Sequence, residues 1–352
     1  MPVNAAEQPP SEQGTELAWL DTARILAILA VVLLHVSAAV VIQCPPGTVH
    51  WWIGNLVDST TRWCVPVFVM ISGALLLDPG RQETAATFYR KRAARIAIPL
   101  LFWTVFYLLW AMLKGIRSGH PPLPGELAER VLAGVPHYHM WFLYMILPLY
   151  LVTPFLRRLV RATDRRVFGT ATVSLLALAA GVTAIGYPEP VGRGSFLSLF
   201  LYYIPWFLLG YMLRTMQGDV SRTRTVPFAL LTMATTAAGV HLLTLRLGLD
   251  SGLYFYDYLS ITVILMSLAM VLFFRSLAWV PGTPALSRRL ARLTLGVYLV
   301  HPVPLELLQH AGLDPLNVHP GIYIPTAFLL ATGLSAVGVL VLQRIPILAR
   351  VV

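Results

Sequence analysis

Residues 19–42 read WLDTARILAILAVVLLHVSAAVVI, and this stretch decides the fold. Its only charged residues are Asp21 and Arg24, both near its start, and its one imidazole is His35. A helix that crosses a bilayer needs about 20 mostly apolar residues. The stretch therefore predicts a transmembrane helix that carries ionisable groups inside the apolar layer.

The composition of the whole chain agrees with this prediction. Of its 352 residues, 57% are hydrophobic and 12% are charged, against about 25% charged in an ordinary soluble domain. This excludes a soluble enzyme, a disordered protein and a fibrous protein. The net charge of +10 is explained by the excess of Lys and Arg in cytoplasmic loops, so no nucleic acid is expected as a partner.

The apolar segments predict an all-α polytopic membrane protein with about ten transmembrane helices. With both termini cytoplasmic, 20 of the 26 Lys and Arg residues fall in cytoplasmic regions and 6 in outer loops, as the positive-inside rule requires. Residues 1–16 predict a short disordered cytoplasmic tail, and residues 17–352 predict one membrane domain. The expected spans are 19–42, 63–77, 96–113, 140–156, 167–187, 195–213, 225–245, 257–274, 292–309 and 321–343.

The first span places three chemical groups on one stripe. Arg24 and His35 are eleven residues apart, which puts them about 20° apart around a helix and about 16 Å apart along it. Asp21 lies one turn before Arg24, where it can pair with the guanidinium. An ionisable residue inside a span indicates a functional site, although Arg24 alone would also fit a side chain that reaches the interface.

A basic segment, FYRKRAARIAIPLLFW at 88–103, precedes the third span. Arg92 and Arg95 are three residues apart and hence neighbours on a helix, with Arg90 close by. Paired guanidinium groups suit a phosphate. The plain alternative is ordinary cytoplasmic charge.

Two further groups of residues are candidates for substrate binding. Tyr298 and His301 lie three apart in the ninth span, which Pro302, Pro304 and Glu306 interrupt, and a packed histidine is the plain alternative there. The second group would line an outer mouth of the kind that holds sugars, or would be ordinary loop residues: Asn55, Asp58, Arg62, His137, His139 and Trp141.

Other features restrict the chemistry. Ser72 lies in a small-residue patch, SGA, that predicts close helix packing. Cys44 and Cys64 are either a disulfide near the outer side or two buried thiols. There is no P-loop, GxSxG or HExxH motif, and the nine histidines have no ligand spacing, so no metal is expected.

Five motifs in order resemble acyltransferase family 3, the integral membrane O-acyltransferases, over about residues 17–345. Span 1 resembles the family's Arg-x10-His signature at Arg24 and His35, and RKRAARIAIP (90–99) its Arg-x-x-Arg motif at Arg92 and Arg95. The other three segments that carry the resemblance are VPVFVMISGALLL (65–77), HMWFLYMILPLYLVTP (139–154) and TLGVYLVHP (294–302). The likeness is closest to the branch that O-acetylates surface polysaccharides.

The resemblance implies an enzyme of the inner (plasma) membrane that moves an acetyl or other acyl group from cytoplasmic acetyl-CoA to a glycan hydroxyl. Under this interpretation Arg90, Arg92 and Arg95 hold coenzyme A, and Arg24 holds the donor or orients the site. His35 is the general base or a transient acyl carrier. Expected partners are the bilayer, a surface polysaccharide or lipid-linked glycan, and a second copy of the chain or other glycan-biosynthesis proteins.

Two other function classes remain open at this point. A multi-span glycan or lipid transporter would also place ionisable groups inside its spans, but it would ignore acetyl-CoA. A sensor or scaffold without catalysis would tolerate the loss of Arg24 and His35.

Overall fold

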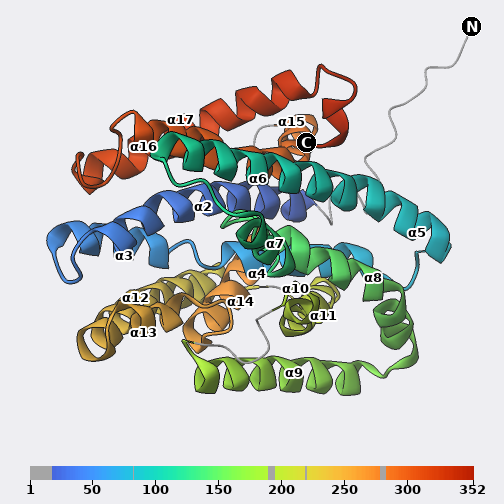
Figure 1. Cartoon of the computed structure of the whole chain (residues 1–352). Coiled ribbons are helices and arrows are strands. Elements are labelled where there is room, and N and C mark those ends of the chain that lie inside the picture. The colour runs from blue at the N-terminus through green and yellow to red at the C-terminus, as the bar shows by residue number, and fades with distance from the viewer. Residues whose placement is uncertain (1–17, 82, 189–194, 219, 278–282) are drawn as a thin grey trace, which may run out of the picture.

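The computed structural model describes residues 18–81, 83–188, 195–218, 220–277 and 283–352, so the predicted tail at 1–16 lies outside them. Within these residues the chain is built from helices and has no strand. The long helices run side by side as one bundle (Figure 1). The N-terminal third comprises α2 (Ala18–Gln43), α3 (Val49–Ser59), α4 (Cys64–Leu76), α5 (Ala85–Arg92), η1 (Ala93–Ala97), α6 (Ile98–Ser118) and α7 (Pro124–Leu132).

The rest of the chain completes the bundle around α2, which contacts α3, α4, α14, α15 and α17. In Figure 1, α9 lies along the edge of the bundle. Short helices α10, η2, α13, η3 and η4 span Phe196–Leu199, Phe200–Tyr203, Leu249–Gly252, Leu253–Tyr256 and Leu348–Arg350. The remaining helices are α8 (Trp141–Ala162), α9 (Arg165–Gly186), α11 (Ile204–Arg214), α12 (Arg222–Leu247), α14 (Ile261–Arg275), α15 (Pro284–Val300), α16 (Pro302–His310) and α17 (Pro320–Leu342).

Nine helical segments of the described residues are long and apolar enough to cross a membrane, which confirms the polytopic all-α class. Several predicted boundaries are wrong. The second span is the pair α3–α4, Val49–Leu76, and not 63–77; the third is Ala85–Ser118 and not 96–113. The predicted span 292–309 is not one helix but α15 followed by α16.

A π-helical turn, η1, joins α5 to α6 and carries Arg95 of the basic motif, while Arg92 ends α5. Such a turn inserts one residue into the helical repeat and occurs frequently at functional sites. Here it changes the facing of Arg95 relative to Arg92, which stands just before it. The helix therefore continues from the basic segment into the third span.

The break between α15 and α16 follows from Pro302, which has no backbone N–H and cannot bond to the carbonyl of Tyr298. The His301 side chain binds that carbonyl instead, and its Nδ1 lies 2.7 Å from the Tyr298 oxygen. Because a carbonyl only accepts, Nδ1 carries the proton and Nε2 does not. His301 is fully buried, and this Nε2 has no hydrogen-bond partner among the described residues.

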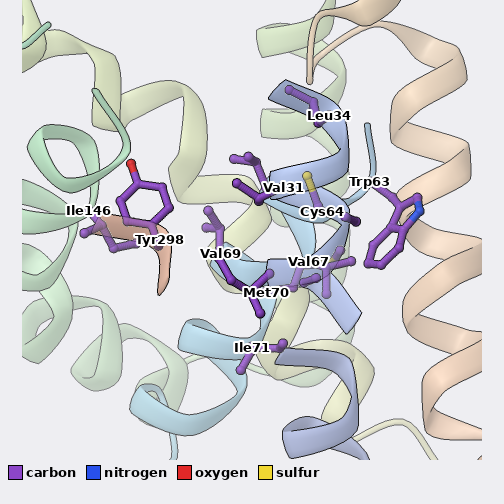
Figure 2. Packing of buried hydrophobic residues seen from close by; sticks show 14 of the residues in the cluster. Val31, Leu34, Trp63, Cys64, Val67, Val69, Met70, Ile71, Ile146 and Tyr298 are labelled. Atoms are coloured by element: carbon purple, nitrogen blue, oxygen red, sulfur yellow. The ribbon is translucent and has the colours of Figure 1, made fainter. Parts of the chain in front are cut away.

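Helices α4 and α11 cross at two glycines. A Cβ on Gly73 would lie 1.8 Å from the Phe207 carbonyl oxygen, and one on Gly210 would lie 1.9 Å from that of Met70. Such close approach gives helices in a bilayer their packing contacts, as the SGA patch predicted. Figure 2 shows the buried side chains of α4 packed beside Val31 and Leu34 of α2.

Two arginines bind the carbonyls at the end of α4. Arg157 donates to the Leu76 oxygen from Nε (3.0 Å) and Nη2 (2.8 Å), and Arg214 Nη1 donates to the Ala74 oxygen at 2.7 Å. These bonds satisfy carbonyls that have no partner within the helix.

Cys44 and Cys64 are both buried free thiols, so the two-thiol interpretation is the correct one.

Candidate active site

Three cavities lie in series through the bundle, and we name them from their walls. With the open space at their mouths included, the arginine cavity measures about 850 Å³, the central cavity about 910 Å³ and the aromatic cavity about 1520 Å³. The first two share lining residues Arg24, Ser72, Arg95, Ile96, Tyr150 and Thr294. The central and aromatic cavities share Leu34, His35, Trp141 and Tyr258. Each cavity therefore adjoins the next across common walls, and we call the three together the path.

The two functional residues predicted on span 1 mark the two junctions of this path. Arg24 lines both the arginine and the central cavity, and His35 lines both the central and the aromatic cavity. Asp21 Oδ1 accepts a hydrogen bond from Arg24 Nη1 at 3.3 Å. The helical stripe inferred from spacing is thus a wall of the path.

The arginine cavity contains Arg24, Arg81, Arg92 and Arg95. The Nε of Arg92 is buried and has no hydrogen-bond partner among the described residues. The Arg92 guanidinium lies 5.7 Å from the Phe88 ring centre, within reach of a cation–π contact. Arg90 is exposed and is not part of this cavity wall. The cavity therefore offers several cationic donors to one anionic group.

Arg81 was not selected from the sequence, because a lone arginine in a short turn has no distinguishing pattern. It lies 3.8 Å from Glu83, whose carboxylate also pairs with Lys91 at 3.2 Å and with Arg157 at 3.5 Å. Partial burial alone would raise the pKa of Glu83. The hydrogen bond from Lys91 and the charges of Lys91, Arg157 and Arg81 outweigh burial and lower this pKa.

The His35 ring stands among other rings. It stacks on His301 with ring centres 5.2 Å apart and planes 21° apart, and it lies 4.9 Å from Tyr138. Within the described part of the chain, neither of its ring nitrogens has a protein hydrogen-bond partner. An imidazole placed by packing at a cavity junction keeps both nitrogens available to a bound molecule.

Trp141 and Tyr258 form an aromatic wall at the same junction, with ring centres 5.7 Å apart and planes 26° apart. His139 and Tyr298 line the central cavity beside them. The Tyr298 hydroxyl donates to the carbonyl of His139, which ties α15 to the turn before α8. His301, also predicted to bind substrate, lines none of the three cavities, and its ring stacks against that of His35.

The predicted outer mouth separates into two parts. Asp58 and Arg62 line the aromatic cavity and are paired, with 2.5 Å between Oδ1 and Nε. The Arg62 guanidinium lies 3.9 Å over the Tyr256 ring. Asn55 is fully buried instead: its amide donates to the Ala237 oxygen at 3.0 Å, and its oxygen accepts from Tyr256 at 2.6 Å. Asn55 therefore supports the wall and is not part of the cavity lining.

A fourth cavity of about 1130 Å³, the lateral cavity, lies next to the aromatic cavity and shares Val135 and Tyr138 with it. Glu306 and His137 line it. The sequence marked Glu306 only as an interruption of a span, because its partners come from α6 and from the turn before α8. Those partners appear only when the helices are assembled.

Comparison with known proteins identifies the family of the chain that forms this path. A family model described as acyltransferase domain (Acyl_transf_3) matches residues 17–343, which include all three cavities. No curated protein and no solved structure matches the chain significantly. The matched region covers nearly the whole chain, and the chain therefore belongs to the acyltransferase 3 family.

Proposed function

We propose that this membrane acyltransferase moves an acetyl group, or a related acyl group, from acetyl-CoA to a hydroxyl of a surface polysaccharide or lipid-linked glycan. In this proposal the protein lies in the plasma membrane, and the arginine cavity opens to the cytoplasm. The observation that carries the proposal is the position of His35. Its ring stands where the path changes from an arginine-lined to an aromatic-lined half.

The arginine cavity supports a coenzyme A donor. Coenzyme A carries a diphosphate and a further phosphate, and Arg81, Arg92 and Arg95 supply guanidinium groups for bidentate contacts. The central cavity then continues for about 16 Å from Arg24 to His35, by the rise of α2. Its largely apolar wall suits the extended thioester arm of the donor, with the acyl group at the far end.

The aromatic cavity supports a sugar acceptor. Trp141 and Tyr258 provide ring faces, and the Asp58–Arg62 pair provides both a hydrogen-bond acceptor and donors. Small-molecule sites characteristically combine an apolar or aromatic wall with a few fixed polar groups. A glycan hydroxyl entering from this side would meet the acyl group at His35.

The reaction joins the acceptor oxygen to the acyl carbon and breaks the carbon–sulfur bond of the thioester. The hydroxyl loses its proton, and the departing coenzyme A thiolate gains one. His35 takes the hydroxyl proton as general base, or its nitrogen first carries the acyl group. Arg24, paired with Asp21, holds the donor at the entrance to the central cavity.

The test uses purified protein in nanodiscs with acetyl-CoA, and follows acetyl-CoA binding and release of free thiol. We expect His35→Ala to bind acetyl-CoA normally but to lose thiol release. The matched control is His310→Ala, because His310 is exposed and lines none of the cavities of the path. Wild-type protein that fails to bind acetyl-CoA would overturn the proposal and favour a transporter.

A further inference from the structure

A carboxylate outside the three-cavity path is connected to it through two histidines. Glu306 Oε1 lies 2.9 Å from His137 Nε2, and His137 Nδ1 lies 3.1 Å from His139 Nδ1. Glu306 and His137 line the lateral cavity, whereas His139 lines the central cavity. These two cavities share no lining residue, and the row of hydrogen bonds connects the wall of one with the wall of the other.

The carboxylate is ionised by its surroundings. Glu306 Oε2 accepts from Lys114 Nζ and from Trp110 Nε1, each at 2.8 Å. The ammonium charge at this distance holds the group in its ionised form, in which both oxygens accept. Since Lys114 already balances its charge, a neutral His137 leaves the group without net charge, which the partly buried position favours.

The ionised carboxylate fixes where the protons lie on both histidines. His137 must donate from Nε2 to Glu306, so a neutral His137 has a bare Nδ1 that accepts. His139 must then donate from its own Nδ1, which leaves its Nε2 bare. That Nε2 is buried and has no hydrogen-bond partner among the described residues. One carboxylate thus produces an unprotonated nitrogen on a residue of the central cavity wall.

We propose that His139 is the general base for the acceptor hydroxyl, held in this tautomer by Glu306 acting through His137. The inference rests on the proposed acyl transfer and assigns a second histidine to it. His139 is the catalytic residue, and His137 and Glu306 are positioning residues. The arrangement leaves the His35 ring to carry the acyl group.

The proton balance is closed within the site. As the acceptor oxygen bonds to the acyl carbon, the bond from that carbon to His35 breaks and the hydroxyl proton goes to His139 Nε2. The imidazolium that forms keeps its Nδ1–H on His137, with Glu306 as the counter-charge. It then gives its proton, through water, to the coenzyme A thiolate, which restores the starting tautomer.

The first test measures the tautomers without turnover. The full chain, labelled with ¹⁵N-histidine in nanodiscs, is examined by solid-state NMR, and loss of signals in His139→Gln assigns that residue. We expect His139 protonated at Nδ1 only and His137 at Nε2 only. A His139 protonated at Nε2, or a doubly protonated His137, would overturn the proposal.

The second test compares variants at the same carboxylate. Glu306→Gln no longer selects one tautomer. We expect steady-state thiol release, in which each turnover requires the acyl group to leave His35 for a hydroxyl or water, to fall by about 10²–10⁴-fold, as for loss of a positioned acid–base group. The first-turnover release that loads His35 should remain. Acetyl-CoA binding should stay within about twofold, because the arginine cavity is untouched. Trp110→Phe removes only the indole donor to the other carboxylate oxygen, so its rate should stay near that of the wild type.

The outcomes separate this inference from the proposed function. An equal loss in Trp110→Phe and Glu306→Gln would show that Glu306 is only a structural anchor and would overturn the base assignment. An active wild type whose Glu306→Gln variant keeps full rate would do the same. Wild-type protein that neither binds acetyl-CoA nor releases thiol would instead overturn the proposed function itself.

Discussion

Replacing Gly73 by alanine tests the packing that holds one wall of the path in place. The added Cβ would lie 1.8 Å from the Phe207 carbonyl oxygen, whereas ordinary contact begins near 3.4 Å. Helices α4 and α11 must therefore separate by about 1.6 Å, because a backbone carbonyl inside a helix cannot rotate away. Phe68 and Ser72 of α4 line the central cavity and would move with it.

The expected magnitude comes from two opposing effects. Overpacking costs about 1–3 kcal/mol, and the upper part of that range applies because the obstacle is backbone. Replacing glycine by alanine in a helix returns up to about 1 kcal/mol. We expect a net loss of about 2 kcal/mol, or about 3 °C in Tm for a chain of 352 residues.

The assay is thermal unfolding of matched preparations in one detergent. The control is Gly181→Ala on α9, where a Cβ would meet no atom within 4 Å. The double variant with Gly210→Ala should lose less than the sum of the single losses, because the first separation makes room for the second Cβ. Equal Tm values for Gly73→Ala and Gly181→Ala would refute the close crossing.

Three further predictions concern charge. The lowered pKa of Glu83 stabilises the fold above the ordinary pKa of about 4.3, and this contribution is lost as the pH falls through the folded-state pKa. The acid-induced drop in Tm should therefore be smaller in Glu83→Gln. Asp58→Ala leaves the half-buried Arg62 without its carboxylate partner. The unfolding free energy should therefore fall by at most about 3–5 kcal/mol, and Asp58→Ala with Arg62→Met should recover part of it. Arg92→Ala should raise the Kd for acetyl-CoA about tenfold or more by isothermal titration, while exposed Arg90→Ala should not; equal effects would contradict the cavity assignment.

Much of the site on α2 could be predicted from spacing alone. The angle and rise of an α-helix place Arg24 and His35 on one stripe, and the structure has them at the two junctions of the path. Because a single helix has a fixed rotation and rise per residue, the number of residues between two positions gives their angle and distance. Arg92 and Arg95, expected as neighbours on a helix, both line the arginine cavity, whereas Arg90 is exposed and does not.

Contacts between distant segments could not be predicted in this way. Asn55 shared a polar stretch with Asp58, but α12 and η3 close over Asn55 and leave Asp58 at the cavity. Glu306 meets its partners from two other segments. Only assembled helices decide which of two neighbouring polar residues faces a cavity.

The most direct test of the account is a cryo-EM structure of the full chain with a thioether analogue of acetyl-CoA. The account predicts the diphosphate within hydrogen-bond distance of Arg92 and Arg95, and the acyl carbon beside His35 between the central and aromatic cavities. A donor bound at the aromatic end, or one whose acyl group ends away from His35, would contradict it.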